Sequence, residues 1–372
     1  MQRLLAVAYK ESSEIVRDPV RLLAYLLVPA ILMLIFGHGM NLDIDNIPFT
    51  TLDYDNSSQS REYIDSYIQS EYFDYQGPSY SDEEVYRKMV SGRSKFFLEI
   101  PAGFGRNLSS DRTPQVGAFI DGTIPFRGET ARGYVVGTHF SYLQNYIREV
   151  SGKEIDIIPV DVESRYWYNK TFESKNTFVP GMIAMILTVF PGIIITLAIS
   201  REKELGTIVN FYTTPLTRLE FLLGKQVVYL VISTVNLFIL IFMAIYAFDL
   251  QIKGNFLLLT IGGIIYLVTA TGVGMLFSAI AKTQIAGLLM TMILSMVPSF
   301  IYSGLMTPIS SLEDSAIIMS NFYAVKHFTQ LIIGSFTKDL SLSITMFNYV
   351  SMILFYIVVL SICLLLLKKQ EK

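Results

Sequence analysis

The side chains that could carry out acid–base, nucleophilic or metal chemistry are few and scattered in this sequence. The chain has three histidines, far apart, and one cysteine in an apolar run. Asp53 and Asp55 could hold a cation, but no glycine-centred calcium loop surrounds them. Such a pair is more typical of a turn that caps a helix. We therefore expect no catalytic residue and no metal site, and a single Cys363 excludes a disulfide framework.

The sequence also carries no loop for the phosphates of ATP. That loop is typically Gly-x-x-x-x-Gly-Lys-Ser/Thr, and Gly224-Lys225 lacks the upstream glycine. We therefore expect the chain to bind no ATP itself. The five apolar runs of the second half contain no Asp, Glu, Lys, Arg or His, whereas ion-driven transporters usually keep a charge there. This pattern argues against a secondary transporter.

Composition places the chain in a membrane. Hydrophobic residues make up 52% of it and charged residues 16%. Six apolar runs are long enough to cross a hydrocarbon core of ~30 Å. They cover residues 22–40, 178–200, 226–248, 256–281, 283–306 and 344–367. Residues 1–21 are predicted to form a cytoplasmic amphipathic helix on the membrane surface. Its apolar stripe would contain Leu4, Leu5, Ala8, Ile15 and Val16.

A polar insert, residues 41–177, separates the first two apolar runs. Its composition predicts an α/β domain, with strands at 48–53, 95–100 and 115–120 and helices at 58–69, 81–90 and 127–150. The insert has 21 acidic and 14 basic residues, a net charge of −7, while the rest of the chain carries +4. Because basic loops stay in the cytoplasm, we expect the insert outside and both termini inside.

The longest polar interruption of the second half is residues 201–225. Read as a helix from Arg201, it has one face with Leu205, Ile208, Val209 and Tyr212, and an opposite face with Lys203, Gly206, Thr207 and Asn210. Thr214-Pro215 breaks this helix. Thr217 and Glu220 form a capping box that begins the next helix. The segment 201–216 is therefore predicted to be a surface helix, followed by a turn back into the membrane.

This segment resembles one in a known family. Arg201-Glu202-Lys203-Glu204-x-Gly206-Thr207, followed by Thr214-Pro215 and Gly224-Lys225, is similar to the coupling segment of ATP-binding-cassette (ABC) exporter permeases of the type-two export class. Asp53–Ser58 and Trp167-Tyr168-Asn169 are further points of resemblance. The resemblance implies a polytopic α-helical membrane protein with six transmembrane helices and an α/β extracytoplasmic domain between helices 1 and 2. It also implies that the external loop 307–343 forms a re-entrant helical pair.

The resemblance implies a function as well. The chain would be the permease subunit of an exporter that moves a lipophilic small molecule, drug, lipid or ion out of the cytoplasm or inner leaflet. ATP and Mg²⁺ would be bound by a separate ABC ATPase subunit, and this chain would hold no cofactor. Its other partners would be a second permease copy or paralogue and membrane lipids, with a periplasmic adaptor left open and no nucleic acid. The location would be the bacterial cytoplasmic (inner) membrane.

The residues that the resemblance assigns to ATPase coupling are Arg201, Glu202, Lys203, Glu204, Gly206, Thr207, Asn210, Thr214 and Pro215. Lys203, Thr207 and Asn210 would face the ATPase. Leu205, Ile208 and Val209 would hold the helix on the bundle, and Arg201, Glu202 and Glu204 would orient it by ion pairing. The mild polarity and flexibility of the spans suggest a substrate cavity lined by Thr188, Phe190, Met290, Met292, Met296 and Phe300. Plain helix packing is the alternative for these six.

Two other classes of protein fit part of the pattern. An ATPase-independent cell-envelope receptor or scaffold could have the same topology, with an ordinary interfacial helix at 201–216, but it would not need the Arg201–Thr207 string. A membrane-embedded hydrolase would need clustered His, Ser and Asp or intramembrane carboxylates. The sequence does not supply that cluster.

Overall fold

The computed structural model describes residues 2–39, 46–108, 110, 114–123, 125–151, 174–207, 215–306, 309, 312–338 and 340–367. The chain divides into two compact units. The membrane unit consists of Met1–Leu42 and Tyr166–Lys372, and the inserted domain is Asp43–Arg165. The Trp167-Tyr168-Asn169 motif lies outside the described residues.

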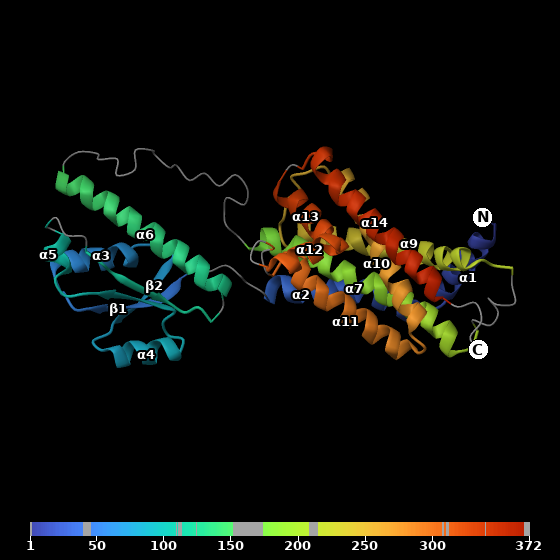
Figure 1. The fold of residues 1–372 in the computed structure, drawn as a ribbon, viewed down its shortest axis with the longest axis horizontal. Coiled ribbons are helices and arrows are strands. Elements are labelled where there is room, and N and C mark those ends of the chain that lie inside the picture. Colours follow the sequence, from blue (N-terminus) through green and yellow to red (C-terminus); the bar gives the residue numbers. More distant parts are fainter. Residues whose placement is uncertain are drawn as a thin grey trace. The chain divides into compact units, whose positions relative to one another are not determined.

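The membrane unit is helical throughout its described part (Figure 1). Within the described residues, six helices are long and apolar enough to cross a membrane. These are α2 (Pro19–Gly39), α7 (Lys175–Glu204), α9 (Arg218–Tyr246), α10 (Phe256–Ile280), α11 (Gln284–Tyr302) and α14 (Leu342–Leu366). Each coincides with one of the six predicted apolar runs, which confirms a polytopic helical membrane protein. The shorter helix α1 (Gln2–Val16) precedes them and packs against α9.

Helix α7 forms the centre of the membrane unit and packs against α2, α9, α10, α11 and α13 (Figure 1). Its contact with α10 is unusually close, because Gly192 and Gly274 face each other. A side-chain carbon added to Gly274 would collide with the carbonyl oxygen of Gly192. Small residues at such crossings let helix backbones touch, which is how helices associate in lipid.

The segment predicted to be a re-entrant pair contains two helices. They are α12 (Asp314–Phe322) and α13 (Ala324–Thr337), with Tyr323 between them. Helix α13 packs against α7, α10 and α14, and its Phe328 and Leu331 are fully buried. The ring of Phe328 stacks on that of Tyr266 at 4.2 Å between centroids. Burial in protein explains why this short apolar helix is stable at its position.

The inserted domain contains one four-stranded sheet. Strand order is β2 (Phe73–Pro78), β1 (Ile47–Asp53), β3 (Phe96–Ile100) and β4 (Gly117–Ile120). Strand β1 is parallel to both neighbours, and β4 is antiparallel to β3. Three of these strands match the predicted ones. Strand β2 was not predicted, because its sequence FDYQGP contains Gly and Pro, which are depleted in strands.

Helices cover both faces of this sheet (Figure 1). On one face lie α3 (Ser58–Ile68) and α6 (Pro125–Ser151), whose buried side chains share a core with Phe49, Phe96 and Leu98. On the other face, α4 (Asp82–Val90) contacts β1. The short helix α5 (Phe104–Leu108) completes the domain. The insert is therefore an α/β unit with its own aromatic core.

The Asp53/Asp55 pair belongs to a turn. Asp53 Oδ1 accepts a hydrogen bond from the backbone N–H of Asp55 at 2.9 Å. The Asp55 carboxylate accepts from the N–H groups of Gly103 and Gly105 at 2.6 and 2.9 Å. Hydrogen bonds from the Ser57 side chain and these N–H groups hold the pKa of Asp55 below its ordinary value. Both carboxylates therefore bind neighbouring parts of the protein.

Candidate functional site

The end of α7 differs from the sequence-based expectation. A separate surface helix was predicted to begin at Arg201, but Arg201–Glu204 form the last turn of α7. The N–H of Leu205 donates to the carbonyl of Arg201 at 2.9 Å, and Gly206 follows with φ +72°. Nothing before Gly206 breaks the helix, and glycine tolerates this left-handed conformation, which commonly ends helices. Asn210 and Thr214 lie outside the described residues.

Glu202 joins this last turn to two other helices. Its Oε1 atom accepts a hydrogen bond from Lys10 Nζ of α1 at 2.8 Å. The same oxygen lies 3.3 Å from Lys225 Nζ of α9. The predicted ion-pairing role of Glu202 is therefore present, with cations from α1 and α9 as its partners.

Lys203 lies against the C-terminal end of α10. Its Nζ donates to the carbonyl oxygens of Ser278 and Ala279 at 2.7 and 2.8 Å, and to that of Ala281 at 3.3 Å. The last carbonyls of a helix have no partner within the helix and attract a cation. Within this chain Lys203 therefore binds the end of α10, and its contact with an ATPase stays a prediction.

Glu204 contacts a third element, the start of α11. Its Oε2 accepts from the backbone N–H of Gln284 at 2.8 Å and from Gln284 Nε2 at 3.2 Å. Leu205 was predicted to hold the segment on the bundle, but it is 63% exposed. Thr207 is also exposed, and its hydroxyl donates to the carbonyl of Glu202 at 3.3 Å. Arg201 is half-buried.

A buried ion pair lies beneath this turn. The side chains of Lys225 and Glu11 are 1% and 4% exposed, and Lys225 Nζ contacts Glu11 Oε2. The other carboxylate oxygen, Oε1, accepts from the Tyr229 hydroxyl at 2.5 Å. Burying charges is costly unless they are paired and hydrogen-bonded. Here Lys225 is paired with both Glu11 and Glu202, and Glu202 is also paired with Lys10. Each buried charge therefore has a partner of opposite sign.

Helix α1 brings Glu11 to this position. Glu11 and Ile15 are buried on the face that packs against α9. Gly224 makes the approach possible, because an added side-chain carbon would lie 2.8 Å from Val7 Cβ. Leu5 and Val16, predicted on the apolar stripe, are instead 60% and 72% exposed.

Glu11, Lys225 and Tyr229 were not predicted as functional residues. A signal existed, because Glu11 is spaced four residues from both Val7 and Ile15 and so shares their helix face. A carboxylate among apolar residues needs a cation from a neighbouring element. The partner, however, is 214 residues away in the sequence.

The start of α9 is held by a capping box and by hydrogen bonds to α1 and α14. The predicted capping box is confirmed, with Thr217 accepting from the Glu220 N–H and Glu220 accepting from the Thr217 N–H. Arg3 Nη1 of α1 donates to the carbonyl of Pro215 at 2.7 Å. Arg218 Nη1 donates to the carbonyl of Leu364 in α14 at 3.0 Å.

The six predicted cavity residues lie in different environments. Thr188 donates to the carbonyl of Ala184 at 2.7 Å and contacts the Tyr266 hydroxyl. Phe190 packs against the central core, and Phe300 packs with Phe178, Met182 and Met185. Met290 is half-buried, whereas Met292 and Met296 are exposed on α11. Within this single chain, these side chains do not form one cluster, so their cavity role remains a prediction.

The arrangement is suited to transmitting force. Segment 205–217 connects α7 to α9, and its two ends are held near α1 by Glu202–Lys10 and Pro215–Arg3 contacts. The turn before it also bonds to the end of α10 and the start of α11. A displacement of this segment would therefore be felt by five helices at once.

Comparison with known proteins gives consistent results. A family model described as "ABC-2 family transporter protein" matches residues 22–366. The probable multidrug ABC transporter permease YbhS of Escherichia coli is 28% identical over 327 residues, covering 87% of this chain and 85% of that protein. The probable multidrug ABC transporter permease YbhR of the same organism is 25% identical over 343 residues, covering 92% of each. ABC transporter G family member 20 of Dictyostelium discoideum is 21% identical over 365 residues, which is 96% of this chain and 48% of that protein.

Proposed function

The chain belongs to the ABC-2 family of transporter proteins, and we propose that it is the permease subunit of an ATP-driven exporter. In this proposal, a separate ATPase subunit binds ATP and Mg²⁺ and docks on segment 205–217. A second permease, identical or paralogous, completes the transport path. The cargo is a lipophilic small molecule, drug, lipid or ion that leaves the cytoplasm or inner leaflet. The relatives named as probable multidrug permeases favour a drug among these cargoes.

One observation carries the proposal. Three consecutive side chains at the end of α7 bind three different places in the bundle: Glu202 binds α1 and α9, Lys203 binds α10, and Glu204 binds α11. A loop that merely joins two spans needs none of these contacts. A segment that receives force from outside the bundle needs them, because independent helices would otherwise move separately.

The permease would depend on a partner for its energy. The sequence has no phosphate-binding loop, so ATP must be bound elsewhere. We propose that ATP-driven closure of the ATPase displaces segment 205–217, and that α7 passes this motion to the centre of the bundle. Because interfaces and packed cores are bistable, a small displacement can switch between two arrangements. These would be the inward- and outward-facing states.

Topology follows from the same proposal. Segment 205–217 and both termini would lie in the cytoplasm, because Arg201, Lys203, Arg218 and Lys225 flank this segment and basic residues favour the cytoplasmic side. The inserted domain would lie outside. The membrane would be the bacterial inner membrane, in which a periplasmic adaptor could accept the cargo.

The proposal can be tested with purified protein. The chain alone should hydrolyse no ATP and should not transport under a proton gradient. Co-expression with an ABC ATPase encoded beside it should give a stable complex whose ATP hydrolysis is stimulated by lipophilic cargo. Proton-driven transport by the isolated chain would refute the proposal. Absence of any ATPase complex would favour the alternative, an envelope receptor or scaffold with the same topology.

A further inference from the structure

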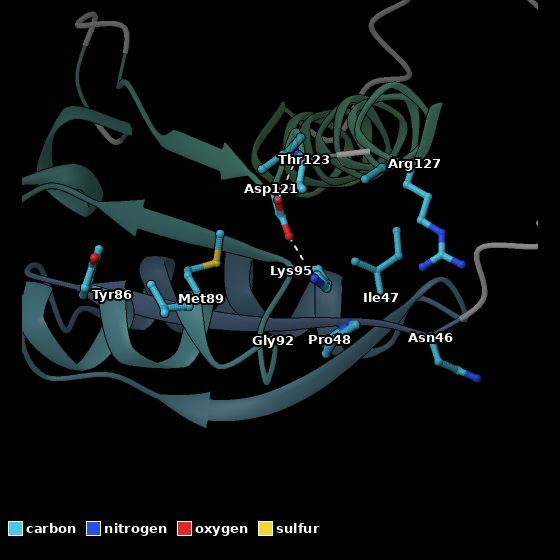
Figure 2. A pocket seen from close by; sticks show the side chains of 13 residues that line it. Asn46, Ile47, Pro48, Tyr86, Met89, Gly92, Lys95, Asp121, Thr123 and Arg127 are labelled. Atoms are coloured by element: carbon cyan, nitrogen blue, oxygen red, sulfur yellow. Dashed lines mark hydrogen bonds and ion pairs between the residues drawn. The ribbon is translucent and has the colours of Figure 1, made fainter. Parts of the chain in front are cut away.

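A cavity of about 660 Å³ lies in the inserted domain, outside the helical membrane unit. It is lined by the beginnings of β1 and β3, the end of β4, the second half of α4 and the beginning of α6 (Figure 2). Its volume falls in the range of small-molecule sites, which are mostly apolar with a few polar groups that fix orientation. None of its residues belongs to the segment proposed to dock an ATPase.

Six of the thirteen residues that line this cavity have apolar aliphatic or thioether side chains. They are Ile47, Pro48, Met89, Val90, Ile120 and Ala131. The nearby Val90 and Tyr86 on α4 are 69% and 68% exposed. Figure 2 shows Tyr86 and Met89 on α4, away from Arg127 at the start of α6. The methionine is flexible and can adapt to an alkyl chain.

Of the three charged side chains that line the cavity, Lys95 and Asp121 are paired with each other, and Arg127 is paired with neither. Lys95 Nζ forms an ion pair with Asp121 Oδ2 at 2.9 Å. The other oxygen, Asp121 Oδ1, accepts from the Thr123 N–H and hydroxyl at 3.0 and 2.5 Å. The lining's one carboxylate is thus fully engaged. Arg127 is exposed, and no side chain in the described part of the chain pairs with it.

Arg127 therefore supplies a positive charge in a stretch of sequence whose net charge is −7. In the view of Figure 2 its guanidinium points away from the Lys95–Asp121 pair. A guanidinium is always charged and presents a planar fork of N–H donors that matches a carboxylate. It also lies in the first turn of α6, where the helix dipole adds positive potential.

We propose that this cavity binds an amphiphilic anion, with its carboxylate on Arg127 and its aliphatic chain along Ile47, Met89 and Ile120. Contact with these apolar side chains removes part of the tail from water, which favours binding. The head group sets the charge preference. This inference goes beyond the proposed transport function and does not require that an ATPase docks on the chain.

The test uses the full-length chain in lipid nanodiscs and a local chemical readout. A Met89→Cys substitution places a thiol in the cavity, and its reaction with a charged maleimide is timed. The native Cys363 is fully buried, and the unsubstituted chain gives the background. Glu62→Cys, at an exposed position of α3 outside the cavity lining, is the matched control. Octanoate is compared with 1-octanol, which lacks the charge, and with acetate, which lacks the tail.

Octanoate should slow labelling of Met89→Cys and leave Glu62→Cys unaffected, and acetate should protect neither. Adding Arg127→Gln should raise the half-protecting octanoate concentration by about tenfold, and Arg127→Lys should restore part of the protection. Protection by 1-octanol should be weaker and independent of Arg127. Equal protection by octanol and octanoate, or no protection by either, would overturn the proposal. Unchanged protection by 1-octanol in Arg127→Gln shows that the cavity of this variant remains folded.

Discussion

Lys225 and Glu11 form an ion pair from which solvent is almost entirely excluded, although 214 residues separate them. The pair joins the start of α9 to α1. Its third member, Glu202, belongs to the last turn of α7. The three helices therefore meet at one charged point, next to the last turn of α7. Through these contacts, the packing of α1 is coupled to the two helices, α7 and α9, that flank the proposed docking segment.

Removal of one partner of this pair should destabilise the chain strongly. Lys225→Met leaves the Glu11 carboxylate buried without its cation, and breaking such a pair typically costs about 3–5 kcal/mol. Thermal unfolding of the detergent-purified chain measures the loss. Lys282→Met, at an exposed lysine, is the control and should change stability by less than about 0.5 kcal/mol. The Glu11→Leu/Lys225→Met double variant should lose less than the sum of the two single losses. If the loss of the double variant equalled the sum of the two single losses, Glu11 and Lys225 would not interact directly.

Lys203 should contribute to the stability of the isolated chain. Lys203→Met removes the cation from the last carbonyls of α10, where a charge is worth about 1 kcal/mol and up to ~2 kcal/mol when partly buried. The melting temperature of the chain purified without any partner should fall, and Lys203→Arg should recover part of it. The control is Lys253→Met, at an exposed lysine. An unchanged melting temperature for Lys203→Met would mean that these carbonyl contacts contribute nothing to stability.

The inserted domain should lose local stability in mild acid. Partial burial lowers the pKa of His139 below its ordinary value of 6.5, and its Nδ1 lies 3.0 Å from the Tyr63 hydroxyl. The unfolded state therefore binds the proton more readily than the folded state. Stability is complete above pH 6.5 and falls as the pH drops toward the folded-state pKa. Hydrogen exchange of α3 amides, corrected for intrinsic rates, should show easier opening at pH 5.5 than at pH 7.5. His139→Gln should remove this difference, and its persistence would assign the effect to another group.

The sequence contained enough information for most of the elements but not for the contacts between them. Hydropathy located all six spans, because a span must be apolar along its whole length. The Thr217–Glu220 box was predictable, since both halves lie within one turn. The partners of Lys203 were not, because the carbonyls at the end of α10 are brought there only by packing. The same holds for Glu11, whose cation lies on another helix.

The largest error at the site concerned where one helix ends. Amphipathic spacing from Arg201 suggested a new helix, but spacing alone does not require a break before it. Helix α7 continues to Glu204 because no residue interrupts it until Gly206. Lys203 therefore binds the end of α10. Of the two described residues that were predicted to face an ATPase, Lys203 and Thr207, only Thr207 is exposed.

Topology should be visible by cysteine labelling in intact cells. In a Cys363→Ser background, cysteines at Asp82 in α4 and Gln251 between α9 and α10 should react with an impermeant thiol reagent. A cysteine at Asn210 should react only after the cells are opened. The reason is the charge asymmetry, which keeps the basic segment inside. Labelling of Asn210→Cys in intact cells would reverse the proposed arrangement.

The central claim is that segment 205–217 docks on an ATPase, and substitutions in that segment test it most directly. Thr207→Arg and Asn210→Asp each add a charge that must be desolvated at an interface. Thr234→Ser in α9 is the control within a span. Losses at a buried interfacial position commonly exceed ~2 kcal/mol, or about thirtyfold in affinity. The measurement is copurification of the ATPase, together with transport, at equal membrane levels of each variant. We predict that both segment variants fold but lose the ATPase or lose transport, while the control keeps both. Wild-type copurification and transport by both variants would mean that the segment only connects two helices.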